Sequence, residues 1–572
     1  MDEKPQTWIG RRPQSGLRGT NLIQVPAKTA EKPQTWTGLH IWHDIGFRHP
    51  PVNRIFPIAS ENFRLSKVVG GHIIKLSMKK TAYLAAMLLC CACQGNLIEY
   101  TDDPIADESS TDDGGITTVD GTIAIVFSES AVKVSGDKDG IVTVSGTDVT
   151  VTNSSENCYT YSLSGSCADG SFKLYSGCKQ VIELGGLSLT NPDGAAINNQ
   201  SHKYTSVIVK GDNYLADGSV DSSGAYRSET SDEDMKGAFF SEGQLVFSGD
   251  GTLTVKAIGK AGISSDDYIS ITGTPEIKIT STAGHGLRGK DSVTVDGGTL
   301  DISVSGAGAK GIKSDGDGYF NAGTVKVTVT GSNTGSSSSG GGPGWGWGSS
   351  EDDDSSSAKA LKFDGNLYFS GADVTASASS HEAIEAKGKI SITAGNISAT
   401  SSDDAINSGS DLTVSGGSVY AYSSGNDGID ANGNMYIEGG YVFAVGCGSP
   451  EVALDANTEK NCRLYIKGGT VIAVGGIESG SSLSQAVVNV SSWKSSTSYS
   501  LYDGDTLLVG FTSPSKGGSG IVISHPGLKS GSSYTLKYGT SSSTLTASLS
   551  SQGGGGQGGG QGGGDGHGGR RW

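Results

Sequence analysis

The sequence lacks long helical periodicity, long apolar runs and an excess of basic residues. Without helical periodicity beyond the N-terminal region, a helical bundle is excluded. The chain has 42 Lys and Arg against 59 Asp and Glu, which gives a formal net charge of −17. Because neutralising phosphate needs clustered basic side chains, nucleic acid is not an expected partner. The spacing of Cys158, Cys167 and Cys178 is poor for zinc, although it allows one disulfide in an exported protein.

One short apolar run lies in residues 78–93 and begins with Met-Lys-Lys. Two lysines, a short apolar core and small residues at its end predict a secretory signal peptide, which is too short to span a bilayer. We therefore interpret residues 1–77 as a mis-assigned start, with a real N-terminal extension as the alternative. The end of the run resembles a bacterial lipobox, so Cys93 is the predicted lipidation site and Cys91 the second choice. Lipidation would anchor the protein at the outer membrane or cell surface, and ordinary export without a lipid is the alternative.

A short pattern returns throughout residues 236–476: a small residue, an apolar anchor, a polar turn, and two alternating runs separated by a glycine turn. The steps between successive anchors are 24, 24, 25, 49, 23, 22, 23 and 25 residues. Alternation predicts strands with one buried face, and a unit of this size buries that face by stacking on copies of itself. The sequence therefore predicts an all-β parallel β-helix with one rung per repeat, rather than antiparallel propeller blades. The anchors are Phe239, Ile263, Leu287, Ile312, Leu361, Ile384, Ile406, Ile429 and Leu454.

The regions around the repeat differ from it in composition. Residues 94–118 are acidic and residues 550–572 are rich in Gly and Gln, so we expect a disordered tether and a disordered tail. The β-helix is predicted over residues 119–480, with an insert loop at 332–357 that accounts for the double step. Strand-like runs without the period in residues 481–549 predict a small β module that caps the open end of the solenoid.

Equivalent positions of successive rungs stack about 4.8 Å apart in a β-helix and therefore form columns. Two such columns change from basic to acidic between the same two rungs, and stacked like charges repel by roughly 3 kcal/mol per adjacent pair. Lys359 and Lys362 can relieve this at the sign change by pairing with Glu382 and Glu385. The residue after each anchor gives Ser264, Arg288, Lys313, Lys362, Glu385, Asn407, Asp430 and Asp455. The second residue before each anchor gives Ala261, His285, Lys310, Lys359, Glu382, Asp404, Asp427 and Val452.

The acidic end of the two columns offers hard oxygen ligands, which Ca²⁺ prefers. The chain contains no linear calcium loop, so such a site would be built across rungs. A solvated acidic face without a metal is the alternative. The predicted calcium ligands are Glu385, Asp404, Asn407, Asp427, Asp430 and Asp455.

The basic end is a candidate groove for an acidic polysaccharide, because Arg and Lys pair with carboxylates. The alternative is that the lysine stems only cover the solenoid wall. Two tryptophans of the insert loop could stack on a sugar ring or fold back on that wall. The predicted contact residues are His285, Arg288, Lys310, Lys313, Lys359, Lys362, Trp345 and Trp347.

The repeats at 284–298 and 426–431 resemble those of a bacterial carbohydrate-binding-domain family of secreted right-handed β-helix proteins, similar in fold to pectate lyases. The likeness extends over about residues 120–545. It implies calcium held by stacked carboxylates, and binding of cellulose-like or acidic, pectin-like glycans without established catalysis. Lys310 and Lys359 stand where the family's acidic residue is expected, which leaves the implied calcium on the later rungs.

Three other functions remain as alternatives. A polysaccharide lyase of this fold pairs calcium with an Arg or Lys base, a role for which Arg288 or Lys313 would serve. A galacturonan hydrolase needs two carboxyl groups at a set separation, and the faint likeness at Asp266 and Asp267 falls inside the ordinary repeat. A structural adhesin or surface spacer would have no glycan specificity. We predict a monomeric, non-catalytic lipoprotein that binds polysaccharide through a calcium-containing β-helix.

Overall fold

The structure is a computed structural model that describes residues 63–69, 72–78, 119–334, 357–447 and 450–550. The chain forms two compact units, Met1–Glu108 and Ser109–Trp572. In the first unit, β1 (Phe63–Val69) and β2 (His72–Met78) pair as an antiparallel hairpin.

Several predictions fall outside the described residues. They are the tether, Cys91, Cys93, Trp345, Trp347, most of the insert loop and nearly all of the tail.

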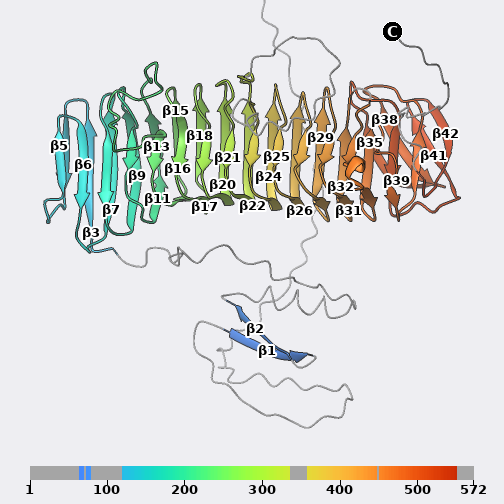
Figure 1. Ribbon diagram of the computed structural model, residues 1–572, viewed down its shortest axis with the longest axis horizontal. Coiled ribbons are helices and arrows are strands. Elements are labelled where there is room, and N and C mark those ends of the chain that lie inside the picture. The colour runs from blue at the N-terminus through green and yellow to red at the C-terminus, as the bar shows by residue number, and fades with distance from the viewer. Residues whose placement is uncertain (1–62, 70–71, 79–118, 335–356, 448–449, 551–572) are drawn as a thin grey trace, which may run out of the picture. The chain divides into compact units, whose positions relative to one another are not determined.

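The second unit contains a parallel β-solenoid of about 12 turns with rungs of about 24 residues, which confirms the predicted all-β fold (Figure 1). The described residues contain no α-helix and one turn of 3-10 helix, η2 (Thr458–Lys460). Within them no helix is long and apolar enough to cross a membrane.

One face of the solenoid is a sheet of 13 strands, here called the anchor sheet because the apolar anchors lie in it. From β19 onward each strand of this sheet holds an inward anchor, one residue at the outward position and one further inward residue, as in Leu287, Arg288 and Gly289. The strands are β5 (Val142–Ser145), β6 (Asp148–Asn153), β8 (Phe172–Ser176), β10 (Ile197–Asn199), β13 (Gly237–Ser241), β16 (Ala261–Ser265), β19 (Leu287–Gly289), β21 (Ile312–Ser314), β23 (Leu361–Phe363), β25 (Ile384–Ala386), β27 (Ile406–Ser408), β30 (Ile429–Ala431) and β33 (Leu454–Ala456).

Two further faces complete each rung, and some strands run along both of them. The second face contains β11 (Thr205–Lys210), β14 (Leu245–Gly249), β17 (Ile269–Ile271), β28 (Leu412–Val414), β31 (Met435–Ile437), β34 (Leu464–Ile466) and β36 (Ser482–Leu483). The third contains β12 (Asp212–Ala216), β15 (Thr252–Ala257), β18 (Glu276–Ser281), β29 (Ser418–Ser423), β32 (Tyr441–Val445) and β35 (Thr470–Val474). The longer strands are β7 (Tyr159–Cys167), β9 (Gln180–Thr190), β20 (Ser292–Val304), β22 (Asp317–Val329), β24 (Leu367–Ala378) and β26 (Ile390–Ser401).

The rungs stack in the register that the anchors predict. In the anchor sheet Arg288 pairs with Lys313, Lys362 with Glu385 and Asp430 with Asp455. All nine anchors have no exposed surface, because they fill the interior between the faces. Burial of one such side chain contributes roughly 1.5–3 kcal/mol, so the repeated anchors account for much of the solenoid's stability.

The turn between the second and third faces explains part of the high glycine content. Gly417 and Gly440 stand at this turn in successive rungs, each with φ of +74°. Residues with a Cβ rarely adopt this conformation, so successive rungs place a glycine at this turn.

Antiparallel strands close both ends of the solenoid. At the N-terminal end β3 (Gly121–Ser128) pairs with β4 (Ala131–Ser135), and β5 pairs with β6. At the other end β40 (Ile521–Ser524) runs antiparallel to β35 and to β37 (Val487–Val490). A four-stranded antiparallel sheet follows, with the order β39 (Thr506–Thr512), β38 (Ser498–Asp503), β41 (Ser533–Tyr538) and β42 (Ser541–Thr546).

The C-terminal sheet packs on the outside of the third face. Tyr499, Leu501 and Phe511 share a hydrophobic cluster with Ile472 and Val474 of the solenoid. The module therefore covers the last rungs.

Candidate functional site

Charged side chains of successive rungs lie next to one another along the anchor sheet. The position after each anchor points outward, while its neighbours on both sides are buried. From Arg288 to Asp455 this position forms one continuous column, here called the outward column.

A buried ion-pair cluster marks the point where the columns change sign. Lys362 has no exposed surface and contacts Asp364 and Glu385 at 3.2 Å each. Lys359 is 5% exposed, ion-pairs with Glu385 and lies 3.3 Å from Glu382. Glu385 is thus held by two lysines, unlike the other predicted calcium ligands.

Burial limits what the predicted basic groove can offer to a polymer. Lys310 is 1% exposed, and its ammonium donates to the Gly308 carbonyl at 3.0 Å. With Lys359 and Lys362 also buried, three of the predicted contact residues do not present their charge at the surface. Arg288 and Lys313 remain partly exposed, with 19% and 24% of their side chains accessible.

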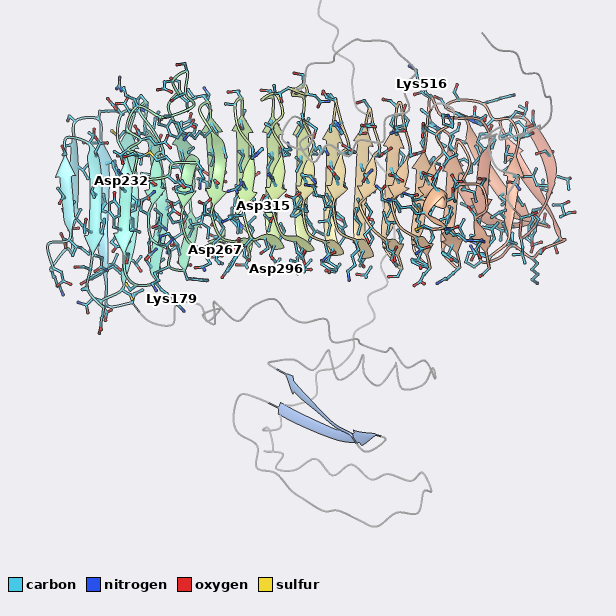
Figure 2. All side chains as sticks on the ribbon, viewed as in Figure 1. Lys179, Asp232, Asp267, Asp296, Asp315 and Lys516 are labelled. Carbon is cyan, nitrogen blue, oxygen red and sulfur yellow. The ribbon has the colours of Figure 1, made fainter. Side chains whose placement is uncertain are left out.

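The third residue after Ile263, Ile312 and Leu361 is an aspartate that serves as a counterion, which the sequence analysis did not identify. Asp266 and Asp315 contact the Arg288 guanidinium at 3.1 and 3.2 Å, and Asp315 also lies 3.4 Å from Lys313. Figure 2 labels Asp315 near the middle of the solenoid wall. Asp364, at the same repeat position, pairs with Lys362. Following this third position along the repeat would have revealed the pairing.

The acidic end of the columns brings carboxylates together around Asn407. The Asn407 amide donates to Asp404 Oδ2 at 3.1 Å and to Asp430 Oδ2 at 3.0 Å. Asp404 and Asp427 also have a structural role, since Asp404 accepts from the Asp427 N–H at 3.1 Å and Asp427 from the Val452 N–H at 2.6 Å.

Burial and mutual repulsion raise the pKa values of this acidic group. Desolvation is the main cause in each case; it raises the pKa of Asp404 to about 6, that of Asp430 to about 7 and that of Asp427 to about 8. The pKa of Asp455 is raised by burial and by the neighbouring Glu478 carboxyl. A cation placed among these groups would favour their ionised forms.

The chemistry of this group fits calcium. The Asp404 and Asp430 carboxylates meet at the Asn407 side chain, and a rotation of the Asn407 amide would direct its oxygen, in place of its nitrogen, toward an ion between them. Two clusters of three metal-ligating side chains, with their ligand atoms within 4.8 Å of one another, occur among the described residues, and both lie outside the predicted calcium site. They are His381, Glu382 and Asp403, and Asp234, Glu242 and Asp266. The sequence prediction included none of these six as a ligand.

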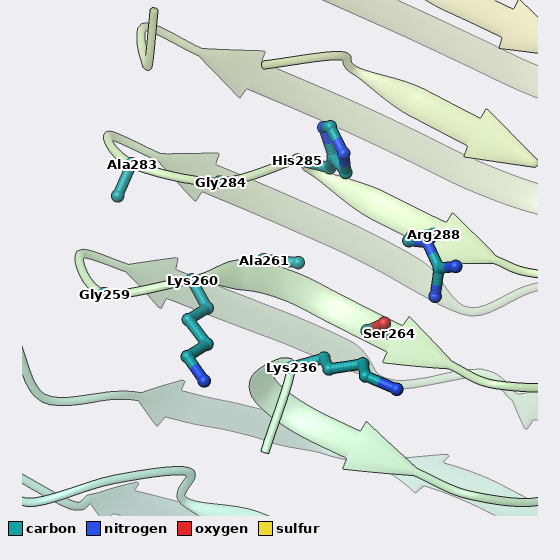
Figure 3. A pocket seen from close by; sticks show the side chains of 9 residues that line it. All are labelled: Lys236, Gly259, Lys260, Ala261, Ser264, Ala283, Gly284, His285 and Arg288. Atoms are coloured by element: carbon teal, nitrogen blue, oxygen red, sulfur yellow. The ribbon is translucent and has the colours of Figure 1, made fainter. Parts of the chain in front are cut away.

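A pocket of about 370 Å³ opens on the anchor sheet at the rungs of β13, β16 and β19 (Figure 3). Three consecutive rungs contribute to it, and it contains two predicted contact residues, His285 and Arg288, together with two lysines that were not predicted. The lining residues are Lys236, Gly259, Lys260, Ala261, Ser264, Ala283, Gly284, His285 and Arg288.

An insertion between β12 and β13, residues 217–236, lies against the anchor sheet on the N-terminal side of this pocket. Its Glu233 pairs with Lys173 of β8 at 2.6 Å and bonds the Tyr175 hydroxyl. The step of 42 residues between Ile197 and Phe239, which pair in adjacent rungs, is the sequence signal of this insertion.

The insertion is also tied to the pocket itself. Glu229 binds the Lys260 ammonium at 2.7 and 2.8 Å. Asp234 binds Lys236 at 2.6 Å, and Lys236 also ion-pairs with Asp266. Lys236, the last residue of the insertion, lines the pocket, so the insertion borders the pocket on its N-terminal side and is here called its wall.

Fold and site together define a β-solenoid with a charged column on one sheet and a walled pocket near the start of that column. A family model described as carbohydrate-binding domain-containing protein matches residues 145–425, just under half of the chain. This match supports carbohydrate binding in general.

Two further comparisons add little. A polysaccharide lyase-like protein from C. thermocellum, solved as a gadolinium derivative, is similar at 19% identity over 55% of this chain and 99% of that chain, with a TM-score of 0.32. This likeness is too weak to transfer a function. No curated protein matches the chain.

Proposed function

We propose that the solenoid is a non-catalytic module that binds polysaccharide along the outward column of the anchor sheet. The observation that supports this most directly is the column itself, because side chains repeated at regular spacing suit a polymer of repeated units. Its rungs from Arg288 to Asn407 lie within the segment that matches the carbohydrate-binding family model.

We further propose that calcium acts at the acidic end of the column. Asp404, Asn407 and Asp430 would hold the ion, with Asp427 and Asp455 close by. When bound, calcium would neutralise the crowded carboxylates and offer a ligand position to a uronate or hydroxyl group of a glycan. Glu385 would remain ion-paired with Lys359 and Lys362 and would not bind the ion.

The expected location is the cell surface, through a lipid on Cys93, and the expected glycans are acidic, pectin-like or cellulose-like polymers. Arg288 and Lys313 are both ion-paired with carboxylates, which favour their protonated forms. Neither is therefore in the deprotonated form that the base of a lyase requires.

The test uses the protein with polygalacturonate and with cellulose, each with and without a calcium chelator. Retention on a polymer that is lost on chelation supports the proposal, provided that no ultraviolet absorbance from unsaturated sugar ends develops. Rising absorbance would establish a lyase instead. No retention on either polymer would favour the surface-spacer alternative.

A further inference from the structure

The cations of the walled pocket, like those farther along the column, are already neutralised. Three cations at the pocket face four carboxylates that contact them, so an added carboxylate would gain little attraction and meet like charge. The cations are Lys236, Lys260 and Arg288, and the carboxylates are Glu229, Asp234, Asp266 and Asp315.

Hydrogen-bonding capacity nevertheless remains on both sides of these pairs. An ammonium has three donors and a guanidinium five, while each carboxylate accepts several bonds. A sugar hydroxyl both donates and accepts, and it is therefore better matched to this mixed lining than an anion is.

Ser264 gives an independent sign that a ligand belongs here. Its side chain lines the pocket and has no exposed surface, and its hydroxyl has no hydrogen-bond partner among the described residues (Figure 3). An unsatisfied buried hydroxyl costs roughly 1–3 kcal/mol, which a hydrogen bond from a ligand would recover.

The insertion limits how far a glycan chain on the outward column can extend toward the N-terminal end of the solenoid. Glu233 and Asp234 hold residues 217–236 across the outward side of the anchor sheet before the pocket, at Lys173 and Gln200. On the other side of the pocket the outward column continues from Arg288 to Lys313. A chain lying on the column would therefore end at the wall.

We propose that this pocket binds the terminal, uncharged sugar residue of a glycan chain whose further residues follow the outward column. The inference rests on the proposed polysaccharide binding and adds the part of the glycan that is recognised. A volume of about 370 Å³ lies at the small end of ligand pockets and leaves room for a terminal sugar ring.

Calorimetry with cello-, manno- and galacto-tetraose, and with tetragalacturonate, tests the inference on the full chain. At least one neutral tetraose should bind, with one protein molecule per glycan chain even for longer chains of the same sugar. Ala283→Trp, which fills the exposed mouth of the pocket, should weaken that binding at least about tenfold. Ser264→Ala should weaken it without lowering the melting temperature.

Ser379→Trp is the control, because Ser379 is an exposed serine in a turn three rungs farther along. It should leave the binding of the neutral tetraose unchanged, and Ala283→Trp should leave any binding of tetragalacturonate unchanged. The inference is overturned if no neutral tetraose binds, if Ala283→Trp has no effect, or if several protein molecules bind one long chain. If retention on a neutral polymer survives Ala283→Trp, the pocket is overturned while the proposed function stays intact.

Discussion

Lys362 shows how an outward position on the solenoid can become buried. Its backbone position faces away from the core, yet its ammonium lies between Asp364 and Glu385 with no exposed surface. Removing one partner of such a pair leaves a buried charge uncompensated, which is strongly destabilising. The sign change in the columns is therefore part of the scaffold, and ligand contact is left to the residues on either side of it.

The aspartates at the other end of the column make stability depend on pH. In calcium-free protein their raised pKa values mean that the folded state holds more protons than the unfolded chain between about pH 4 and pH 8. The free energy of unfolding should therefore fall as the pH rises through this range. The melting temperature, measured at pH 5 and pH 8 with a chelator, should be several degrees lower at pH 8.

A matched variant isolates one member of this group. Asp427→Asn keeps an acceptor for the Val452 N–H but carries no charge, so it should reduce the loss of stability at pH 8. Asp296→Asn, on the exposed outer wall, should leave the pH profile as it is. Calcium should also flatten the profile of the unaltered protein, and an unchanged melting temperature on adding calcium would contradict the proposed metal site.

At the scale of the element, the residue before the anchor is matched in size to a residue on the third face in several rungs. A Cβ on Gly262 would lie 2.3 Å from Ile279 Cγ2, and one on Gly311 would lie 2.0 Å from Val327 Cγ1. In the next rung the residue that pairs with Val327 is Ala376, and the residue before the anchor is Ala360. Glycine thus accompanies a branched side chain in the rungs of Ile263 and Ile312, and alanine accompanies alanine in the rung of Leu361.

This balance predicts coupling between two buried positions. Gly311→Ala should lower the free energy of unfolding by about 1–3 kcal/mol, because the added methyl group overpacks the rung against Val327. The double variant Gly311→Ala/Val327→Ala should be more stable than the sum of the two single changes predicts. Denaturant unfolding of the four proteins measures the coupling, expected at about 0.5–3 kcal/mol. Strict additivity would show that the two sites do not share space.

Rung-level features were accessible from the sequence because they are local and repeated. A small residue before an apolar anchor fixes the register, so Lys362 and Glu385 could be placed side by side without a structure. The insertion at 217–236 could not be placed, because its contacts with Lys173 and Gln200 join segments that follow no period. The insertion borders the pocket. The columns placed Ala261, Ser264, His285 and Arg288 in neighbouring rungs, while only His285 and Arg288 were predicted as contact residues.

For the whole molecule, the C-terminal module protects the open end of the solenoid. Phe443 of the third face contacts Phe511 of the module at 5.8 Å between ring centroids, and β40 occupies the edge of β35. A chain that ends at residue 484 would expose this edge and the apolar cluster beside it.

Such a truncated chain should aggregate and lose more than about 10 °C in melting temperature. Light scattering after size exclusion, together with thermal unfolding, measures both effects. A chain that ends at residue 549 keeps the module and should behave like the full chain. A monodisperse protein of unchanged melting temperature from the shorter chain would show that the solenoid end needs no cover.

The closed ends have a consequence for how this protein can change its length. Because each rung contacts only its neighbours and separate structures close the two termini, whole rungs can be gained or lost between them without disturbing either terminus. Joining Ala405 directly to Ile429 would remove one such rung and bring Glu385 beside Asp430. The length of the column that a glycan can follow therefore changes in whole turns of the solenoid.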